Sequence, residues 1–197
     1  MFRVGTLGLP QYCRLIGEAL GLPEELCRNL YLAAPMHDVG KIAVSDAILE
    51  KTGDLSGRER KIMRQHTLRG YEILRGSDCE LLQIAADIAL AHHEHWDGRG
   101  YPSRLHETEI PLVGRIAAVA DVFDVLTSRR PHKSKWTPQK ARGYIEERAG
   151  KQFDPACVEA FLSRWDDILA IHHDAADCGA GPRQSLPASD AECVHMW

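Results

Sequence analysis

Apolar residues recur at helical spacing along most of the chain. In the first such stretch Pro10 can open a helix and Gly21 can end it. The apolar positions between them fall on one face of that helix, namely Tyr12, Leu15, Ile16, Ala19 and Leu20. Pro23 opens a second helix, which Pro35 should kink or end just before His37.

Similar signals mark the later helices. Ser56 and Glu59 form a capping box ahead of one helix, which carries His66 and reaches about Leu74. A strongly apolar helix follows from about Glu80 to His93. The last three helices begin at Pro111, Thr137-Pro138 and Asp154-Pro155, and the final one ends near Ile171. No segment shows strand alternation, so the sequence predicts an all-α fold.

The two ends of the chain differ from the middle. The first eleven residues hold too many glycines and prolines for a regular helix. Residues 172–197 are small and polar and show no period, so we expect a disordered C-terminal tail. The domain is therefore predicted to span residues 1–171, with 1–11 as an atypical N-terminal segment.

Composition narrows the class of protein. The formal net charge of -4 argues against a general DNA, RNA or membrane-surface binder, which would usually be basic. No run approaches the roughly 18 apolar residues of a membrane span, and the N-terminus lacks the features of a signal peptide. Six scattered cysteines are typical of reduced thiols. We expect a cytoplasmic protein.

Histidine is the unusual residue type, with ten in the chain. Four separated pieces offer metal ligands on the inner sides of predicted helices: His37 with Asp38, His66, His92 with His93, and Asp121. One such histidine alone would more often be a hydrogen-bonded core residue. Asp121, however, lies in an apolar run where a carboxylate without a partner would be costly. Mixed imidazole and carboxylate ligands suit divalent cations that act on phosphate esters, and two-metal hydrolysis needs a bridging group.

The motifs resemble those of the HD-GYP family, a branch of the HD phosphohydrolase superfamily whose domain is a helical bundle. HDVGK spans His37–Lys41 and HHEHWDGRGYP spans His92–Pro102. HTLRG, AVADVFD and LTSRRP follow the family in order and spacing, at residues 66–70, 118–124 and 126–131. An HD dipeptide alone is a weak signal, but the joined motifs are specific. The resemblance covers about Tyr12 to Trp165.

The resemblance implies hydrolysis of cyclic di-GMP to the linear dinucleotide and, in some members, to GMP. It implies two or three iron or manganese ions, of which we expect two. His66, His92 and His93 would hold one ion, and His37, Asp38 and Asp121 the other, with Asp38 bridging. A bridging hydroxide would attack phosphorus.

Basic residues are expected to bind the substrate phosphate. By motif, Lys41, Arg130 and Lys133 would contact it. The alternative is an ordinary solvated lysine for Lys41 and a solvated basic loop for the other two. Tyr101, in the loop of the GYP motif, would form a wall beside the substrate. The same loop is alternatively a surface for GGDEF-domain partners or a purely structural element. Whether the chain forms a homodimer is left open by the sequence.

The chain departs from the family upstream of His37. A Glu and a His usually supply further ligands there, but the corresponding positions hold Met1 and Gly5. We therefore expect no third metal and a weakened second site. Thr67 stands where a proline is usual, which should be a mild change.

The sequence also fits two functions other than a phosphodiesterase. One is a catalytically impaired HD-GYP module that binds nucleotide or a GGDEF partner. The other is an HD phosphohydrolase for a different nucleotide. Metal content distinguishes the impaired module, because such a module would hold one metal or none.

Overall fold

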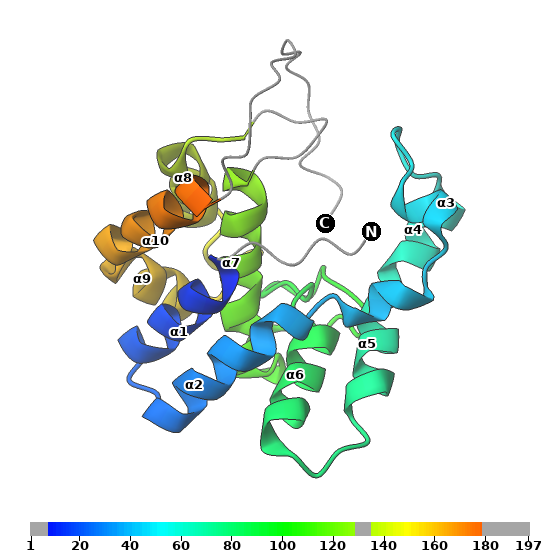
Figure 1. Ribbon diagram of the computed structural model, residues 1–197, viewed down its shortest axis with the longest axis horizontal. Coiled ribbons are helices and arrows are strands. Elements are labelled where there is room, and N and C mark those ends of the chain that lie inside the picture. The colour runs from blue at the N-terminus through cyan, green and yellow to red at the C-terminus, as the bar shows by residue number, and fades with distance from the viewer. Residues whose placement is uncertain (1–7, 129–134, 179–197) are drawn as a thin grey trace.

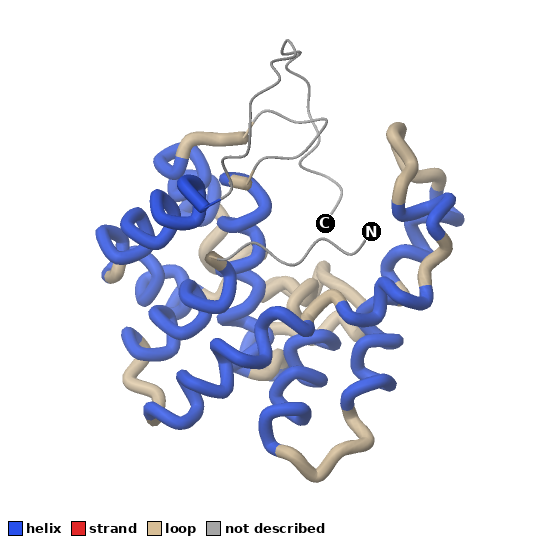
Figure 2. The backbone as a smooth tube through the Cα atoms, in the orientation of Figure 1, coloured by secondary structure: helices blue, strands red, loops and turns tan. Residues whose placement is uncertain are grey.

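The computed structural model describes residues 8–128 and 135–178, and side chains up to residue 174. In this part of the chain the regular structure is entirely helical, apart from one isolated bridge between Ala149 and Phe153. The predicted all-α class is confirmed (Figure 2). The α-helices are α1 (Leu9–Ala19), α2 (Glu24–Ala33), α3 (Asp46–Leu49), α4 (Gly57–Arg64), α5 (His66–Leu74), α6 (Glu80–Ala91), α7 (Leu112–Thr127), α8 (Pro138–Glu147), α9 (Pro155–Ser163) and α10 (Trp165–Cys178). Three short 3-10 helices are η1 (Ala34–Met36), η2 (Val39–Ala43) and η3 (Glu107–Glu109).

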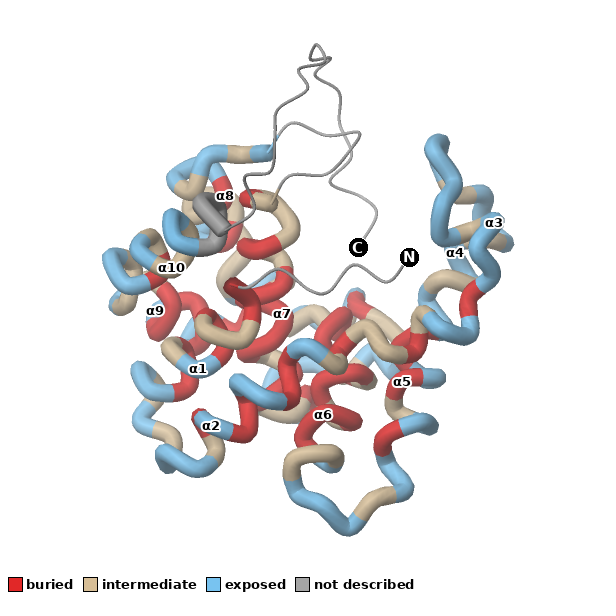
Figure 3. Tube along the Cα trace, viewed as in Figure 1, coloured by how far each residue is buried: buried red, intermediate tan, exposed pale blue. Residues whose placement is uncertain are grey.

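Helix α7 is the central element (Figure 1). It contacts α1, α6, α8 and α9, and eleven of its sixteen residues are buried. On one side α1, α8, α9 and α10 cover it, and on the other α6 connects it to α2 and α5. Burial follows this arrangement, with the most continuous buried stretch along α7 (Figure 3).

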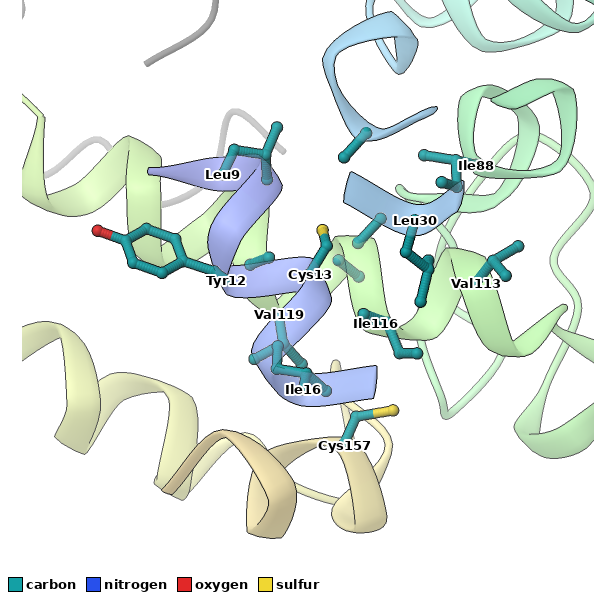
Figure 4. Close-up of a cluster of buried hydrophobic side chains, with 14 of the residues drawn as sticks. Leu9, Tyr12, Cys13, Ile16, Leu30, Ile88, Val113, Ile116, Val119 and Cys157 are labelled. Atoms are coloured by element: carbon teal, nitrogen blue, oxygen red, sulfur yellow. The ribbon is translucent and has the colours of Figure 1, made fainter. Parts of the chain in front are cut away.

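The apolar core forms where these helices meet. Figure 4 shows buried side chains of this core, among them Ile16 of α1, Leu30 of α2, Ile88 of α6 and Ile116 of α7, all fully buried. The Phe123 ring of α7 packs edge-on against Tyr12, with ring centroids 5.2 Å apart. Burial of side chains of this size stabilises the fold by roughly 1.5–3 kcal/mol each.

The predicted start signals act as expected. Ser56 caps α4 with both hydrogen bonds of the capping box. Thr137 and Asp154 accept backbone N–H bonds at the starts of α8 and α9. Pro35 falls where α2 tightens into η1, as predicted.

Two predicted helices are each divided in the structure. The helix expected from Ser56 to Leu74 breaks at Gln65, so His66 begins α5 and does not lie inside a longer helix. The His66 ring and the Thr67 hydroxyl bond to the carbonyls of Met63 and Arg64, at the end of α4. The last predicted helix also breaks, at Arg164.

The predicted end of the last helix near Ile171 is wrong. Helix α10 continues to Cys178, so the proposed tail beginning at residue 172 starts too early. No glycine or proline occurs between Ile171 and Gly179, so the helical backbone can continue to that point. The rest of the predicted tail, residues 179–197, lies outside the described residues, as do Met1 and Gly5.

Candidate metal centre

A close backbone contact places the HD pair beside α5. His37 and Asp38 lie between η1 and η2, and η2 packs on α5. A Cβ atom at Gly40 would lie 1.9 Å from the backbone oxygen of His66 and 2.4 Å from the backbone nitrogen of Gly70. Only glycine allows so close an approach, and it brings Asp38 next to His66.

Three histidines form the first ligand group, the histidine group, which consists of His66, His92 and His93. One possible ligand atom from each lies within 4.8 Å of the others. His66 begins α5, and His92 and His93 directly follow α6. All three are buried.

Backbone carbonyls orient two of these rings. Nδ1 of His66 lies 2.8 Å from the Met63 carbonyl, and Nδ1 of His92 lies 2.9 Å from that of Ile88. When Nδ1–H donates to a carbonyl, Nε2 carries the lone pair that binds a metal. The two Nε2 atoms lie 3.4 Å apart and therefore face one another.

The second group, the carboxylate group, consists of His37, Asp38 and Asp121. His37 Nε2 lies 3.4 Å from Asp38 Oδ2 and 3.7 Å from Asp121 Oδ1. The other oxygen of Asp38, Oδ1, lies 3.4 Å from His66 Nε2. The Asp38 carboxylate thus lies between the two groups, one oxygen toward each. The structure brings together all six residues that the sequence predicted as metal ligands.

The electrostatics keep these donors in ligating forms. Burial and the neighbouring histidines lower the pKa of His92 and of His93 well below the usual range, so both rings stay neutral. Burial tends to raise the pKa of Asp38, but His37 and Lys41 hold it well below its usual value. Lys41 Nζ lies 2.5 Å from Asp38 Oδ2.

His37 behaves differently from the other rings. Burial lowers its pKa, but Asp38 and then Asp121 outweigh burial and raise it to about 9. Without a cation the two carboxylates therefore favour a protonated His37. A metal ion in this group would replace that proton.

The GYP loop forms one wall of the centre. The Tyr101 ring stacks on His93 with centroids 4.8 Å apart, and its backbone N–H donates to the His93 carbonyl. At Gly100 a Cβ atom would lie within 2.6 Å of the backbone of Glu94 and His95. This loop therefore packs directly against the segment that carries His92 and His93.

Glu94 holds the loop. Its Oε1 accepts the backbone N–H groups of Ser103 and Arg104, at 2.7 and 3.1 Å. It also lines a small cavity with His92, His93 and Asp121. These two hydrogen bonds fix the loop.

Sequence reasoning missed one residue near the centre, Arg64. Its guanidinium lies 4.7 Å from the centroid of the Tyr101 ring. The sequence signal that could have identified Arg64 is its position two residues before His66. Arg130 and Lys133, predicted to contact phosphate, lie outside the described residues.

Together these features define an all-helical domain with a buried cluster of side chains that could hold metal ions. Residues 6–157 match a family model described as HD domain. The chain belongs to this family, and its resemblance to the HD-GYP branch is confirmed.

Several curated proteins are similar in sequence. The chain is 43% identical to "3'3'-cGAMP-specific phosphodiesterase 2" of Vibrio cholerae, over 84% of this chain and 32% of that protein. It is 50% identical to "Cyclic di-GMP phosphodiesterase response regulator RpfG" of Xanthomonas campestris, over 75% of this chain and 39% of that protein. It is 43% identical to "Cyclic di-GMP phosphodiesterase" of Thermotoga maritima, over 91% of this chain and 50% of that protein. The chain thus spans a third to a half of the length of these relatives.

A solved structure shares the fold. A cyclic GMP-AMP specific phosphodiesterase of Vibrio cholerae aligns with a TM-score of 0.64 at 20% identity, over 87% of this chain and 48% of that one. In the described part of the chain, no helix is long and apolar enough to cross a membrane.

Proposed function

We propose that the chain is a metal-dependent phosphodiesterase that hydrolyses cyclic dinucleotides, with cyclic di-GMP as its main substrate. The observation that carries this proposal is the Asp38 carboxylate, which faces the histidine group with one oxygen and His37 with the other. Relatives named as cyclic di-GMP phosphodiesterases support it. We expect the linear dinucleotide as first product and GMP after a second cleavage.

The donor set fits two divalent cations. Neutral imidazoles and ionised carboxylates suit iron or manganese. His66, His92 and His93 would hold one ion, and His37 and Asp121 the other, with Asp38 shared. When bound, such ions lower the pKa of water and withdraw charge from a phosphate ester.

The chain's own residues would position and stabilise the substrate. Lys41 is close enough to Asp38 to place a positive charge beside a phosphate at the centre. Tyr101 closes one side of the site, against His93. Arg130 and Lys133 would supply further positive charge.

One relative favours a second substrate, 3′3′-cGAMP, because that protein is named as specific for it. The two candidates differ only in one purine base, so the metal centre cannot distinguish them. The impaired module that binds nucleotide or a GGDEF partner through the GYP loop stands as the non-catalytic alternative.

Turnover of both dinucleotides by one metal-loaded sample tests these proposals. Protein purified without oxygen is stripped with chelator, reloaded with ferrous or manganous ion, and assayed by chromatography of the products. We expect hydrolysis of cyclic di-GMP with the higher kcat/KM, and none by the stripped sample. A higher kcat/KM for 3′3′-cGAMP would reverse the substrate assignment. No turnover of either at full metal occupancy would favour the impaired module.

A further inference from the structure

A second, larger pocket lies beside the metal centre. It has a volume of about 550 Å³ and opens between helix α4, the start of α5 and the GYP loop. Positive side chains line it from two elements that face each other: Lys61 and Arg64 from α4, and Arg99 and Arg104 from the loop. We call it the cationic pocket.

The charge of this pocket is not balanced by its own lining. No carboxylate lines it among the described residues. Lys61, Arg64 and Arg104 form no ion pair with any carboxylate in the described ranges, and Arg99 reaches Asp97 only at 3.7 Å. Four like charges around one space repel one another, so an anion from outside would be favoured there.

Part of the lining is apolar, which indicates a ligand that is larger than a simple ion and has an apolar part. Tyr101, Pro102 and Leu68 share the pocket with the cations, and Leu68 is 44% exposed. Gln65 adds an amide that can both donate and accept hydrogen bonds. A flat base beside apolar side chains, with its phosphate on the cations, matches this combination.

Tyr101 connects the pocket to the metal centre. Its ring stacks on His93 and also lies under the Arg64 guanidinium, so the two sites share this one side chain as a wall. A ligand with a single phosphate would reach one of the two sites. A cyclic dinucleotide carries two phosphates on one ring, so it can place one at each.

We propose that the cationic pocket binds the nucleotide half whose phosphate is not being cleaved. This inference rests on the proposed function. While one phosphodiester lies at the metal centre, Lys61, Arg64 and Arg104 hold the other. The linear product keeps that second phosphodiester, so it binds the pocket in the same way.

Comparing substrates with one and two phosphates tests the proposal. The variant is Lys61→Gln with Arg104→Gln, and Arg58→Gln is the matched control, because Arg58 is exposed on the same helix outside the pocket. With the double variant we expect KM for cyclic di-GMP to rise by about tenfold or more, with the larger rise at low salt. Turnover of bis(p-nitrophenyl) phosphate, which has one phosphate, should change less than about twofold. Thermal melting checks that each variant folds.

The outcomes separate this proposal from the proposed function. An equal KM for the double variant and Arg58→Gln would overturn it. An equal loss on both substrates would also overturn it, because the variant would then act on the metal centre. If the wild-type protein hydrolyses no cyclic dinucleotide, the proposed function fails. The cationic pocket is then tested by measuring the affinity of the wild type and the double variant for the linear dinucleotide. Affinity tenfold weaker in the double variant supports the pocket, and equal affinity overturns it.

Discussion

The two ligand groups of the candidate metal centre are built in different ways. The histidine group comes from two helix ends that pack together, and the backbone of the preceding turn fixes two of its rings. The carboxylate group combines the HD turn with Asp121, from the middle of α7, and its contacts are 3.4–3.7 Å long. Local helix geometry thus arranges the first group, whereas the second depends on how separate elements pack. We expect the first to be the more robust metal site.

The largest effect should come from Gly40, where both groups depend on one backbone contact. Gly40→Ala forces a methyl group into the backbone of α5, which cannot move away cheaply. We expect a loss of about 3 kcal/mol or more in the free energy of unfolding, together with loss of bound metal. Urea denaturation and metal analysis measure both. Gly53→Ala is the control, because its Cβ meets nothing within 4 Å, and equal stability of the two variants would refute the packing argument.

His92→Ala should remove the histidine-group metal while leaving the fold intact. We expect at least one metal fewer per chain, unchanged helicity, and turnover reduced by more than about 100-fold. Loss of a residue that only orients a ligand already costs about 10- to 100-fold. His173→Ala, an exposed histidine on α10, serves as control. Unchanged metal stoichiometry would return His92 to the class of core histidines.

Asp121→Asn tests whether the two groups are separable. The amide is a neutral and weaker ligand, so occupancy of the carboxylate group should fall while the histidine group keeps its ion. Turnover should fall by about 10- to 100-fold and recover partly as manganese is titrated in. The control is Asp87→Asn, a half-buried carboxyl on α6 whose pKa burial raises. Loss of both metals would show that the groups form one cooperative site.

The smallest effect is expected at Thr67, which stands where a proline is usual in the family. Its hydroxyl donates to the Arg64 carbonyl at 3.1 Å. Thr67→Pro loses that bond but places proline in the first turn of α5, where it is tolerated. The change in the free energy of unfolding should stay below about 1 kcal/mol. If the free energy of unfolding falls more in Thr67→Pro than in Thr67→Val, the backbone at this helix start is incompatible with proline.

The sequence by itself determined the fold class and the ligand types. Helical spacing of apolar residues, with proline and capping residues at helix starts, is a local property, and it predicted most helices correctly. The sequence also indicated six candidate ligand positions, because imidazoles and carboxylates in apolar surroundings are costly unless they have partners; the structure places these six side chains close together. The breaks at Gln65 and Arg164 were not readable, since no glycine or proline marks them.

Tertiary structure decided how these residues meet. The position of Asp38 between two ligand groups depends on the contact of Gly40 with α5, which joins residues far apart in the sequence. The hydrogen bonds of Glu94 also depend on packing, because the path of the GYP loop places their donors. The cationic pocket arises only where α4 faces the GYP loop. Sequence patterns report the preferences of single segments, whereas distances between segments follow from packing the whole core.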